Sequence, residues 1–428
     1  MRKARACAFL IFALGLLALS GCWGSRETDE MAYVLALGFD KGEKENLVIT
    51  VTIANPKVIA GISGGGGGNG GGSGGGEGGG TLIYSVESYA PLASIDLLNT
   101  TVDRRVSFLH TKAFIFSEEL AREGLGKWIY PLNRYRELRG TAQIFICRGK
   151  AKDFIEKNTP PLELSPTKQI ELLNLMSRET GFYYITQFNE FYSDTKSESI
   201  HATMPLVALH EGGLESAKAG IGRDGTATSG QYVAGEVPIA GASKAQVIGS
   251  AVFKEDKMVG VLNGQETRYY LILRGLIKSG ITGMPDPSDP NAPMGLLVRQ
   301  ARPPRYTTSI DPEGNVAIDV DIYNEPEIIS IASGYNYEEP ANKALLEEYY
   351  SRQLQEALQN LIRRTQEEFG ADIFGFGRQV KRKFWTIRSW REFQWLDRYP
   401  EASINVTVHS KIRRTGLQLE TKPTSGVE

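Results

Sequence analysis

The chain has 428 residues, of which 41% are hydrophobic and 23% are charged, and this balance is typical of globular protein in two or three domains. The formal net charge is −2 at pH 7. That charge does not favour nucleic acid as a partner, because nucleic-acid-binding domains are typically basic.

Residues 1–21 have the pattern of an export signal. The segment begins with three basic residues, Arg2, Lys3 and Arg5. An apolar stretch follows at 6–19, shorter than the roughly 20 residues of a membrane-spanning helix. Leu19-Ser20-Gly21-Cys22 then resembles the lipobox of bacterial lipoproteins, in which the cysteine sulfur receives a diacylglycerol and the signal is cleaved before it. The alternative is an ordinary secretory signal followed by an incidental cysteine.

The lipobox predicts a covalent diacylglycerol and an N-acyl chain on Cys22, and we expect no other cofactor. Two acyl chains hold a protein stably on a bilayer, at about 0.8 kcal/mol per buried CH₂. We therefore expect the mature chain to be lipid-anchored to the outer face of the bacterial cell membrane. Cys147 would then be the remaining cysteine, and its apolar surroundings predict a buried, inert thiol.

The segment 22–210 is expected to form one α+β unit. Strands are predicted at 31–39 and 47–54, around a polar turn. Residues 61–80 contain fifteen glycines, too many for a packed element, so we expect a disordered insertion there. It does not match a phosphate-binding loop, because no Gly-Lys-Ser/Thr follows. Further strands are predicted at 81–88, 106–117 and 141–149, and helices at 91–102, 117–132 and 150–158.

Residues 211–245 are rich in Gly, Ser and Ala and are predicted to form a long loop or linker. A second module is expected over 246–420, followed by a tail at 421–428. Two strands flank the turn KEDK, and Asn263 with Glu266 forms a variant of the capping box at the start of a helix.

Three further elements are predicted in the second module. Val316, Ile318, Val320 and Ile322 alternate with polar residues, which indicates a half-buried strand. The longest helix is expected at 342–369, and a final strand at 403–412. The buried stripe of that helix is predicted to comprise Leu346, Tyr350, Leu354, Leu358, Leu361 and Thr365. The predicted fold class is α+β: two or three mixed α/β domains with mainly antiparallel sheets and flanking helices, after the cleaved lipoprotein signal peptide.

Several segments together resemble the Ger(x)C family of spore germination lipoproteins. They are GCW followed by RE and LALGFDK, FLHTKAFIFSEELAREGL, GSAVFKEDKMVGVLNGQETR, GADIFGFG and KIRRTGL. The resemblance covers nearly the whole mature chain in the right order, and the chief departures are the stretches at 61–80 and 211–245.

The resemblance implies a subunit of a nutrient germinant receptor in the spore inner membrane. Its implied partners are a permease-like integral membrane subunit and a large membrane subunit with a soluble domain. Mixed α/β domains and no known catalysis are implied as well. The one functional residue that carries over is the lipidated Cys22.

The residues themselves give little support for catalysis. His201 and His210 are near each other in sequence, but no cysteine or carboxylate beside them could serve as a further metal ligand. We therefore expect no metal site. Asp319 and Asp321 share one face of a strand, where a solvated sheet surface is the simpler interpretation than acid–base chemistry. No Gly-x-Ser-x-Gly motif is present.

The segment 377–398 is strongly basic and interleaved with Trp385, Trp390 and Trp395. Export disfavours nucleic acid as its ligand. An anionic membrane surface suits basic and aromatic residues, and the candidates for that contact are Lys381, Arg382, Lys383 and Trp385. The simpler alternative is that the tryptophans anchor the core while the charges are solvated.

Asn263, Glu266 and Arg268 are the candidates for a partner interface. The first two are expected to cap a helix, and Arg268 is hypothesised to face a partner subunit.

The function predicted from the sequence is therefore a lipid-anchored, non-enzymatic subunit of a spore germinant receptor, needed for the germination response to nutrients. A solute-binding lipoprotein of a transporter is the main alternative, and a lipid-anchored hydrolase is a third possibility.

Overall fold

The computed structural model describes residues 2, 5, 28–44, 46–55, 80–163, 166–210, 212, 230–418, 420 and 421. Cys22 and nearly all of the expected signal peptide lie outside the described residues, as do most of the glycine-rich tract, the first half of the segment 211–245 and the end of the tail.

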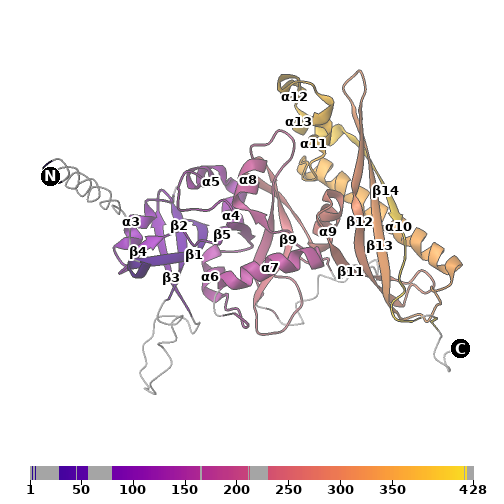
Figure 1. The fold of residues 1–428 in the computed structure, drawn as a ribbon, viewed down its shortest axis with the longest axis horizontal. Coiled ribbons are helices and arrows are strands. Elements are labelled where there is room, and N and C mark those ends of the chain that lie inside the picture. Colours follow the sequence, from indigo (N-terminus) through magenta and orange to yellow (C-terminus); the bar gives the residue numbers. More distant parts are fainter. Residues whose placement is uncertain are drawn as a thin grey trace, which may run out of the picture.

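The described residues form two β-sheets, one built mainly from the first half of the chain and one from the second half (Figure 1). Helix α9 (Gly264–Arg274) connects the two sheets, and helix α7 (Pro166–Thr180) runs alongside the first sheet toward the second. This mixed α/β architecture confirms the predicted α+β fold class.

The first sheet has the strand order β10-β9-β8-β6-β5-β1-β2-β3, with β4 beside β1 and β7 beside β6. Its strands are β1 (Met31–Lys41), β2 (Leu47–Ala54), β3 (Thr81–Ser88), β4 (Arg105–Ser107), β5 (Ala113–Ser117), β6 (Gln143–Cys147), β7 (Thr186–Gln187), β8 (Thr203–Leu209), β9 (Ala245–Lys254) and β10 (Lys257–Leu262). A short 3₁₀ turn, η1 (Thr28–Glu30), precedes β1. The central strands β1, β5, β6 and β8 are parallel, and the outer pairs are antiparallel.

Both faces of this sheet are covered by helices, because its central parallel strands are apolar on both sides. Phe114 and Phe116 of β5 pack into one core, while Ala113 and Ile115 of the same strand pack into another. The first core lies under α3 (Ser94–Asn99), α4 (Glu118–Glu123), α5 (Gly126–Leu132) and α8 (Phe188–Asp194). The second lies under α6 (Ala151–Lys157) and α7.

Two predicted elements of this unit are divided in the structure. The helix expected at 117–132 starts at the predicted N-cap, where Ser117 accepts a hydrogen bond from the Leu120 N–H, but it is split into α4 and α5 at Gly124. Gly124 has a φ of +126°, which breaks the helix. The strand expected at 106–117 is divided into β4 and β5.

The end of the expected linker packs against the first sheet, and the start of the second module belongs to that sheet. Residues 230–244 are a loop, but it is packed, since Ala234 is fully buried and its carbonyl oxygen accepts a hydrogen bond from Arg148. The strands β9 and β10 then extend the first sheet beyond β8. The first sheet therefore continues to Leu262, past the expected boundary at 246, because β9 pairs with the open edge of β8.

The second sheet has the order β11-β12-β13-β14, and β14 is parallel to β13. Its strands are β11 (Ser279–Pro285), β12 (Pro293–Ile310), β13 (Val316–Ile331) and β14 (Ser403–Ser410). The long helix α10 (Pro340–Arg364) continues into a π-helical turn, η3 (Thr365–Phe369), and lies across one face of the sheet (Figure 1). All six residues of its predicted stripe are buried, which confirms that prediction.

Short helical elements follow α10 and cap one end of this core (Figure 1). They are α11 (Phe376–Val380), η4 (Lys381–Lys383), α12 (Ile387–Phe393), α13 (Trp395–Arg398) and η5 (Tyr399–Glu401).

Candidate functional site

The capping box predicted at the start of α9 is present. The Asn263 side chain accepts a hydrogen bond from the Glu266 N–H at 2.8 Å, and the Glu266 carboxylate accepts one from the Asn263 N–H at 2.9 Å. Glu266 also forms an ion pair with Arg364 of α10, at 2.5 Å. These two residues therefore fix the first turn of α9 against α10, and their role in a partner interface stays a prediction.

Arg268, one turn further along α9, does not face outward. It is only 4% exposed, and its guanidinium lies over the ring of Phe182 at 4.1 Å. The guanidinium donates to the Thr180 carbonyl oxygen at the end of α7, and to the carbonyl oxygen of Ile281 on β11. The hypothesis that Arg268 faces a partner subunit is therefore wrong, since its charge is used inside the molecule to connect α7, α9 and β11.

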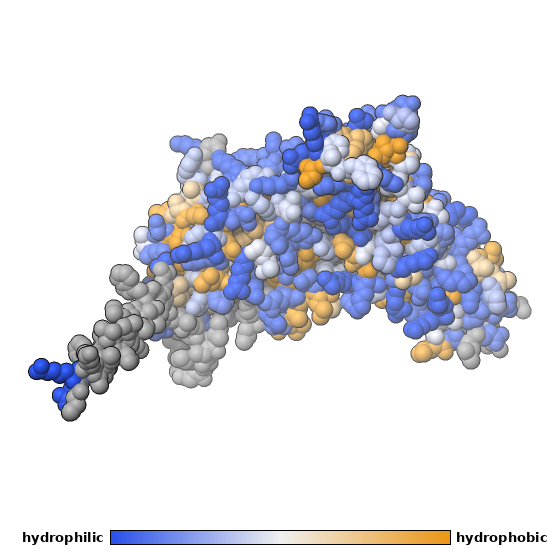
Figure 2. All heavy atoms as spheres, turned by 45° about the horizontal axis from the view of Figure 1, so that its top comes forward, coloured by the Kyte–Doolittle hydropathy of each residue, from blue (hydrophilic) through white to orange (hydrophobic). Residues whose placement is uncertain are grey.

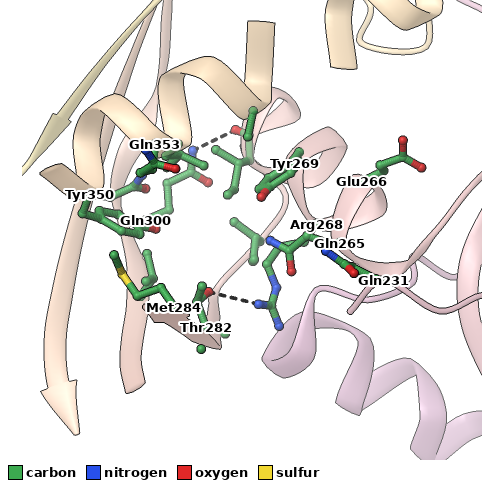
Figure 3. Close-up of a pocket in the computed structure, with 18 of the residues that line it drawn as sticks. Gln231, Gln265, Glu266, Arg268, Tyr269, Thr282, Met284, Gln300, Tyr350 and Gln353 are labelled. Atoms are coloured by element: carbon green, nitrogen blue, oxygen red, sulfur yellow. Dashed lines mark hydrogen bonds between the residues drawn. The ribbon is translucent and has the colours of Figure 1, made fainter. Parts of the chain in front are cut away.

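A partly enclosed cavity of about 300 Å³ lies next to Arg268, between α9, α10 and the edge of the second sheet. Figure 3 shows side chains pointing toward it from all three: Tyr269 from α9, Tyr350 from α10, and Met284 from β11. Gln300 of β12 also lines it and donates to the Ile272 carbonyl oxygen at 3.1 Å. A cavity of this size and mixed lining is typical of a small-molecule site.

Two polar side chains in the cavity wall are buried without complete hydrogen bonding. Asn324 is 2% exposed, and neither its amide nitrogen nor its amide oxygen has a partner in the described part of the chain. Gln265 is 6% exposed, and its amide oxygen likewise lacks one. Since an unpaired buried polar group costs about 1–3 kcal/mol, such groups call for a specific explanation.

Asn324 occupies a position that the sheet pattern would give to an apolar residue. It follows Ile318, Val320 and Ile322 in the inward-facing alternation of β13, and it lies opposite Gln300 on β12. The half-buried strand predicted from the sequence ends its alternation at Ile322. Continuing the alternation by one step would have placed an amide in the core, which is the signal that was missed.

The basic segment 377–398 divides into a buried and an exposed part. Trp390 and Trp395 are each 1% exposed and belong to the core of the second sheet, whereas Trp385 is 98% exposed. The charged residues beside it, Lys381, Arg382 and Lys383, are exposed as well. Figure 2 shows the surface at the top of the molecule as mainly hydrophilic with hydrophobic residues interspersed. The core-anchoring interpretation therefore holds for two tryptophans and fails for the third.

Trp395 is held by a buried carboxylate in the motif GADIFGFG. Asp372 is fully buried, and its side chain accepts hydrogen bonds from four backbone N–H groups, those of Phe374, Gly375, Phe376 and Gly377, and from the Trp395 indole N–H. Burial raises the pKa of Asp372, while the hydrogen bonds from Gly377 and Trp395 oppose the shift. Through these hydrogen bonds, the buried Asp372 carboxylate attaches α11 and α13 to the core.

The other residues considered from the sequence do not assemble into a reactive site. His201 accepts from the Asp372 N–H at 3.1 Å, and His210 bonds the Gly235 carbonyl oxygen at 3.0 Å. Asp321 lies 3.3 Å from the ring of His409, on the solvated face of the sheet. Within the described ranges, no group of three or more His, Cys, Asp or Glu side chains is placed to hold a metal ion.

Cys147 is buried, and burial raises the pKa of its thiol to about 12, so the thiol is protonated at neutral pH. Cys22, the predicted lipid site, lies outside the described residues. None of the helices that the structure describes combines the length and apolar character needed to cross a bilayer.

Fold and site together define a two-sheet α+β protein with a cavity between α9, α10 and the second sheet, and with a buried structural carboxylate. Two family profiles match this chain. One is described as "Spore germination protein N-terminal domain" and covers residues 24–209, and the other is described as "Spore germination B3/ GerAC like, C-terminal" and covers residues 248–416. The chain therefore belongs to the Ger(x)C family of spore germination proteins, which confirms the resemblance noted in the sequence.

Relatives with curated names agree with this membership. Spore germination protein KC of Bacillus subtilis (strain 168) is 23% identical over 418 residues, which are 96% of this chain and 95% of that protein. The putative spore germination protein YfkR of the same organism is 22% identical, over 94% of this chain and 95% of that protein. The crystal structure of the GerBC protein matches with a TM-score of 0.51 and 15% identity, covering 88% of this chain and 97% of that one, which shows a shared fold.

Proposed function

We propose that this chain is a lipid-anchored, non-enzymatic subunit of a spore germinant receptor, needed for the germination response to nutrients. The observation that carries the proposal is the near full-length match to spore germination proteins across both family domains. The partners are a permease-like integral membrane subunit and a large membrane subunit, as the family resemblance implies.

The anchor is a diacylglycerol on the Cys22 sulfur, attached before residues 1–21 are cleaved, together with an N-acyl chain on the Cys22 amine that cleavage frees. A tether of this kind confines the folded domains to a thin layer at the outer face of the spore inner membrane. Confinement raises the effective concentration of the chain at its membrane partners without any added contact. The subunit therefore acts by holding or tuning the complex rather than by chemistry of its own.

The decisive experiment replaces Cys22 with serine in spores. We expect the variant to leave the membrane fraction, to lower the amount of assembled receptor and to slow germination. Mass spectrometry of the natural protein should find the acyl chains on Cys22. Cys147→Ser is the matched control, because that thiol is buried and away from the N-terminus. An unmodified Cys22 together with normal germination of Cys22→Ser would refute the anchor.

An exposed basic surface suits a second membrane contact in the same role. The exposed side chains Lys381, Arg382, Lys383 and Trp385 form what we call the basic patch. Basic residues near an anionic lipid surface contribute about 1 kcal/mol each, and tryptophan favours the interface between water and hydrocarbon. We propose that the basic patch contacts the headgroups of the membrane to which the chain is anchored.

The alternative to a receptor subunit is a solute-binding lipoprotein of a transporter. The cavity between α9 and α10 is the observation that favours this alternative. Co-purification from spore membranes separates the two functions. A receptor subunit brings down the permease-like and large membrane subunits, whereas a transporter component brings down a transport permease and its ATPase.

A further inference from the structure

The cavity beside Arg268 has a lining that the proposed receptor role does not require. Its walls combine apolar surface from Ile272, Met284 and Val298 with amide groups from several strands and helices (Figure 3). A purely structural gap between a helix and a sheet would be lined by apolar side chains, since unpaired amides in a core lower stability.

Asn324 is the group that most needs a partner. Its carboxamide presents a donor nitrogen and an acceptor oxygen side by side. Neither atom has a partner among the described residues, and the side chain is only 2% exposed. The matching ligand edge carries an acceptor and a donor in the same spacing, as another carboxamide or a lactam does. Gln265 adds an unpaired acceptor oxygen, which suits a further N–H of the ligand.

The charges around the cavity decide the charge of the ligand. Glu266 and Arg268 are the charged side chains among the lining residues, and the Glu266 carboxylate is already paired with Arg364. In Figure 3 the Glu266 carboxylate points away from the group of labelled side chains around Tyr269 and Gln300. A cationic ligand would therefore meet the positive guanidinium of Arg268 without a free carboxylate.

An anionic ligand gains less from Arg268 than its charge suggests. The guanidinium already donates to the Thr180 and Ile281 carbonyl oxygens and to the Thr282 hydroxyl. A carboxylate is also acceptor-only, so it would leave the Asn324 amide oxygen and the Gln265 amide oxygen unpaired. A neutral ligand satisfies both without bringing a charge into a half-buried site.

We propose that this cavity binds a small uncharged molecule that carries a carboxamide or lactam edge on an apolar body. The edge pairs with the Asn324 carboxamide, and the apolar body packs between Tyr269, Tyr350 and Met284. The inference does not depend on the proposed receptor function, because it concerns binding by the chain itself.

Three probes of nearly equal shape test it. Benzamide presents a donor and an acceptor, benzoate presents acceptors and a negative charge, and benzamidine presents donors and a positive charge. The full chain is labelled with ¹³C at its methionine methyl groups, and Met284 reports directly because it lines the cavity. We expect benzamide to shift the Met284 signal with a millimolar Kd, and benzoate and benzamidine to bind at least tenfold more weakly.

Asn324→Leu is the matching variant, since leucine has nearly the same shape and no hydrogen-bonding group. We expect at least a tenfold loss of benzamide binding and a raised unfolding midpoint, because the variant removes two unpaired polar atoms. Asn405→Leu, on the exposed face of β14, should leave benzamide binding unchanged.

Three results would overturn the proposal. They are an unmoved Met284 signal up to the solubility limit of benzamide, tighter binding of benzoate or benzamidine than of benzamide, and unchanged binding by Asn324→Leu. A normal benzamide response combined with failure of receptor co-purification would instead refute the proposed function and leave the cavity site standing.

Discussion

Arg268 donates two hydrogen bonds to the Thr180 carbonyl oxygen, from Nε at 3.1 Å and from Nη2 at 2.6 Å. Thr180 is the last residue of α7, which packs on the first sheet, and Arg268 is on α9, which packs between the first sheet and the second. The same guanidinium reaches Ile281 on β11 at 2.9 Å. One side chain therefore joins the two halves of the molecule, and the negative end of the α7 dipole faces its positive charge.

Arg268→Met should destabilise the protein by about 2–4 kcal/mol, because it removes a buried guanidinium and the hydrogen bonds that the partly buried carbonyl oxygens of Thr180 and Ile281 accept from it. Burial lowers the pKa of Arg268 only to about 10, so the side chain is charged at neutral pH and the full set of bonds is lost. Urea unfolding would measure the change. Arg299→Met is the matched control, since its ion pair with Glu327 is partly exposed and should cost under about 1 kcal/mol. Equal effects of the two substitutions would contradict the bridging role.

Asp372→Asn should cost about 2–5 kcal/mol. The carboxylate accepts five N–H donors, and an asparagine in either orientation would turn its own NH₂ group toward at least two of them. Asp319→Asn, a substitution at an exposed carboxylate on β13, should change stability by no more than about 0.5 kcal/mol. Tryptophan fluorescence should report the loss of the Asp372 hydrogen bonds through Trp395. An unperturbed spectrum with full stability would rule out the structural role of Asp372.

His201 should make the protein less stable in mild acid. Burial, with a smaller contribution from Lys254, lowers its pKa from 6.5 to about 4, while Asp397 acts in the opposite direction. The folded state then binds a proton less readily than the unfolded state, so the contribution of His201 is complete above about pH 6.5 and is lost as the pH falls toward 4. The loss over that window is about 3 kcal/mol, at 1.36 kcal/mol per pKa unit.

The measurement compares wild type with His201→Asn, whose amide oxygen can still accept the Asp372 N–H. Stability is followed from pH 7 to pH 4, and the difference between the two curves isolates the contribution of His201 from that of other groups. We expect the variant to have the flatter curve. His110→Asn, at an exposed histidine, should follow wild type. Parallel curves for His201→Asn and wild type would show that His201 does not carry the effect.

Reversing the charge of Lys381, Arg382 and Lys383 to glutamate should abolish salt-sensitive binding of the unlipidated chain to vesicles rich in anionic lipid. Trp385→Ser should weaken binding by about tenfold with little effect on stability, since this side chain is 98% exposed. The control reverses three exposed cations elsewhere, Lys44, Arg134 and Arg352. A similar loss of binding in the control would mean that net charge alone, rather than the basic patch, governs the contact.

Local patterns in the sequence were enough to predict much of the second half of the molecule. The alternation in β13, the Asn263–Glu266 capping box and the six-residue stripe of α10 each depend on neighbours within a turn or two of the chain. Such features are encoded by residue spacing, so they can be read without knowledge of distant contacts. Family membership, too, was accessible from short motifs in the right order.

Other features depend on residues far apart in the chain. The Leu125 and Gly126 N–H groups, at the break between α4 and α5, both bond to Asp256 in the turn between β9 and β10. The strands β9 and β10 joined the first sheet because the edge of β8 was open, and this edge is defined only once the sheet has formed.

The sequence by itself determined the fold class, the family and the elements with strong periodicity. Tertiary structure alone decided that Arg268 points inward, that Trp385 is exposed while Trp390 is buried, and that Asn324 lines a cavity. The physical reason is that periodicity specifies which face of an element is apolar, whereas burial of a particular polar group depends on which distant backbone and side-chain groups surround it.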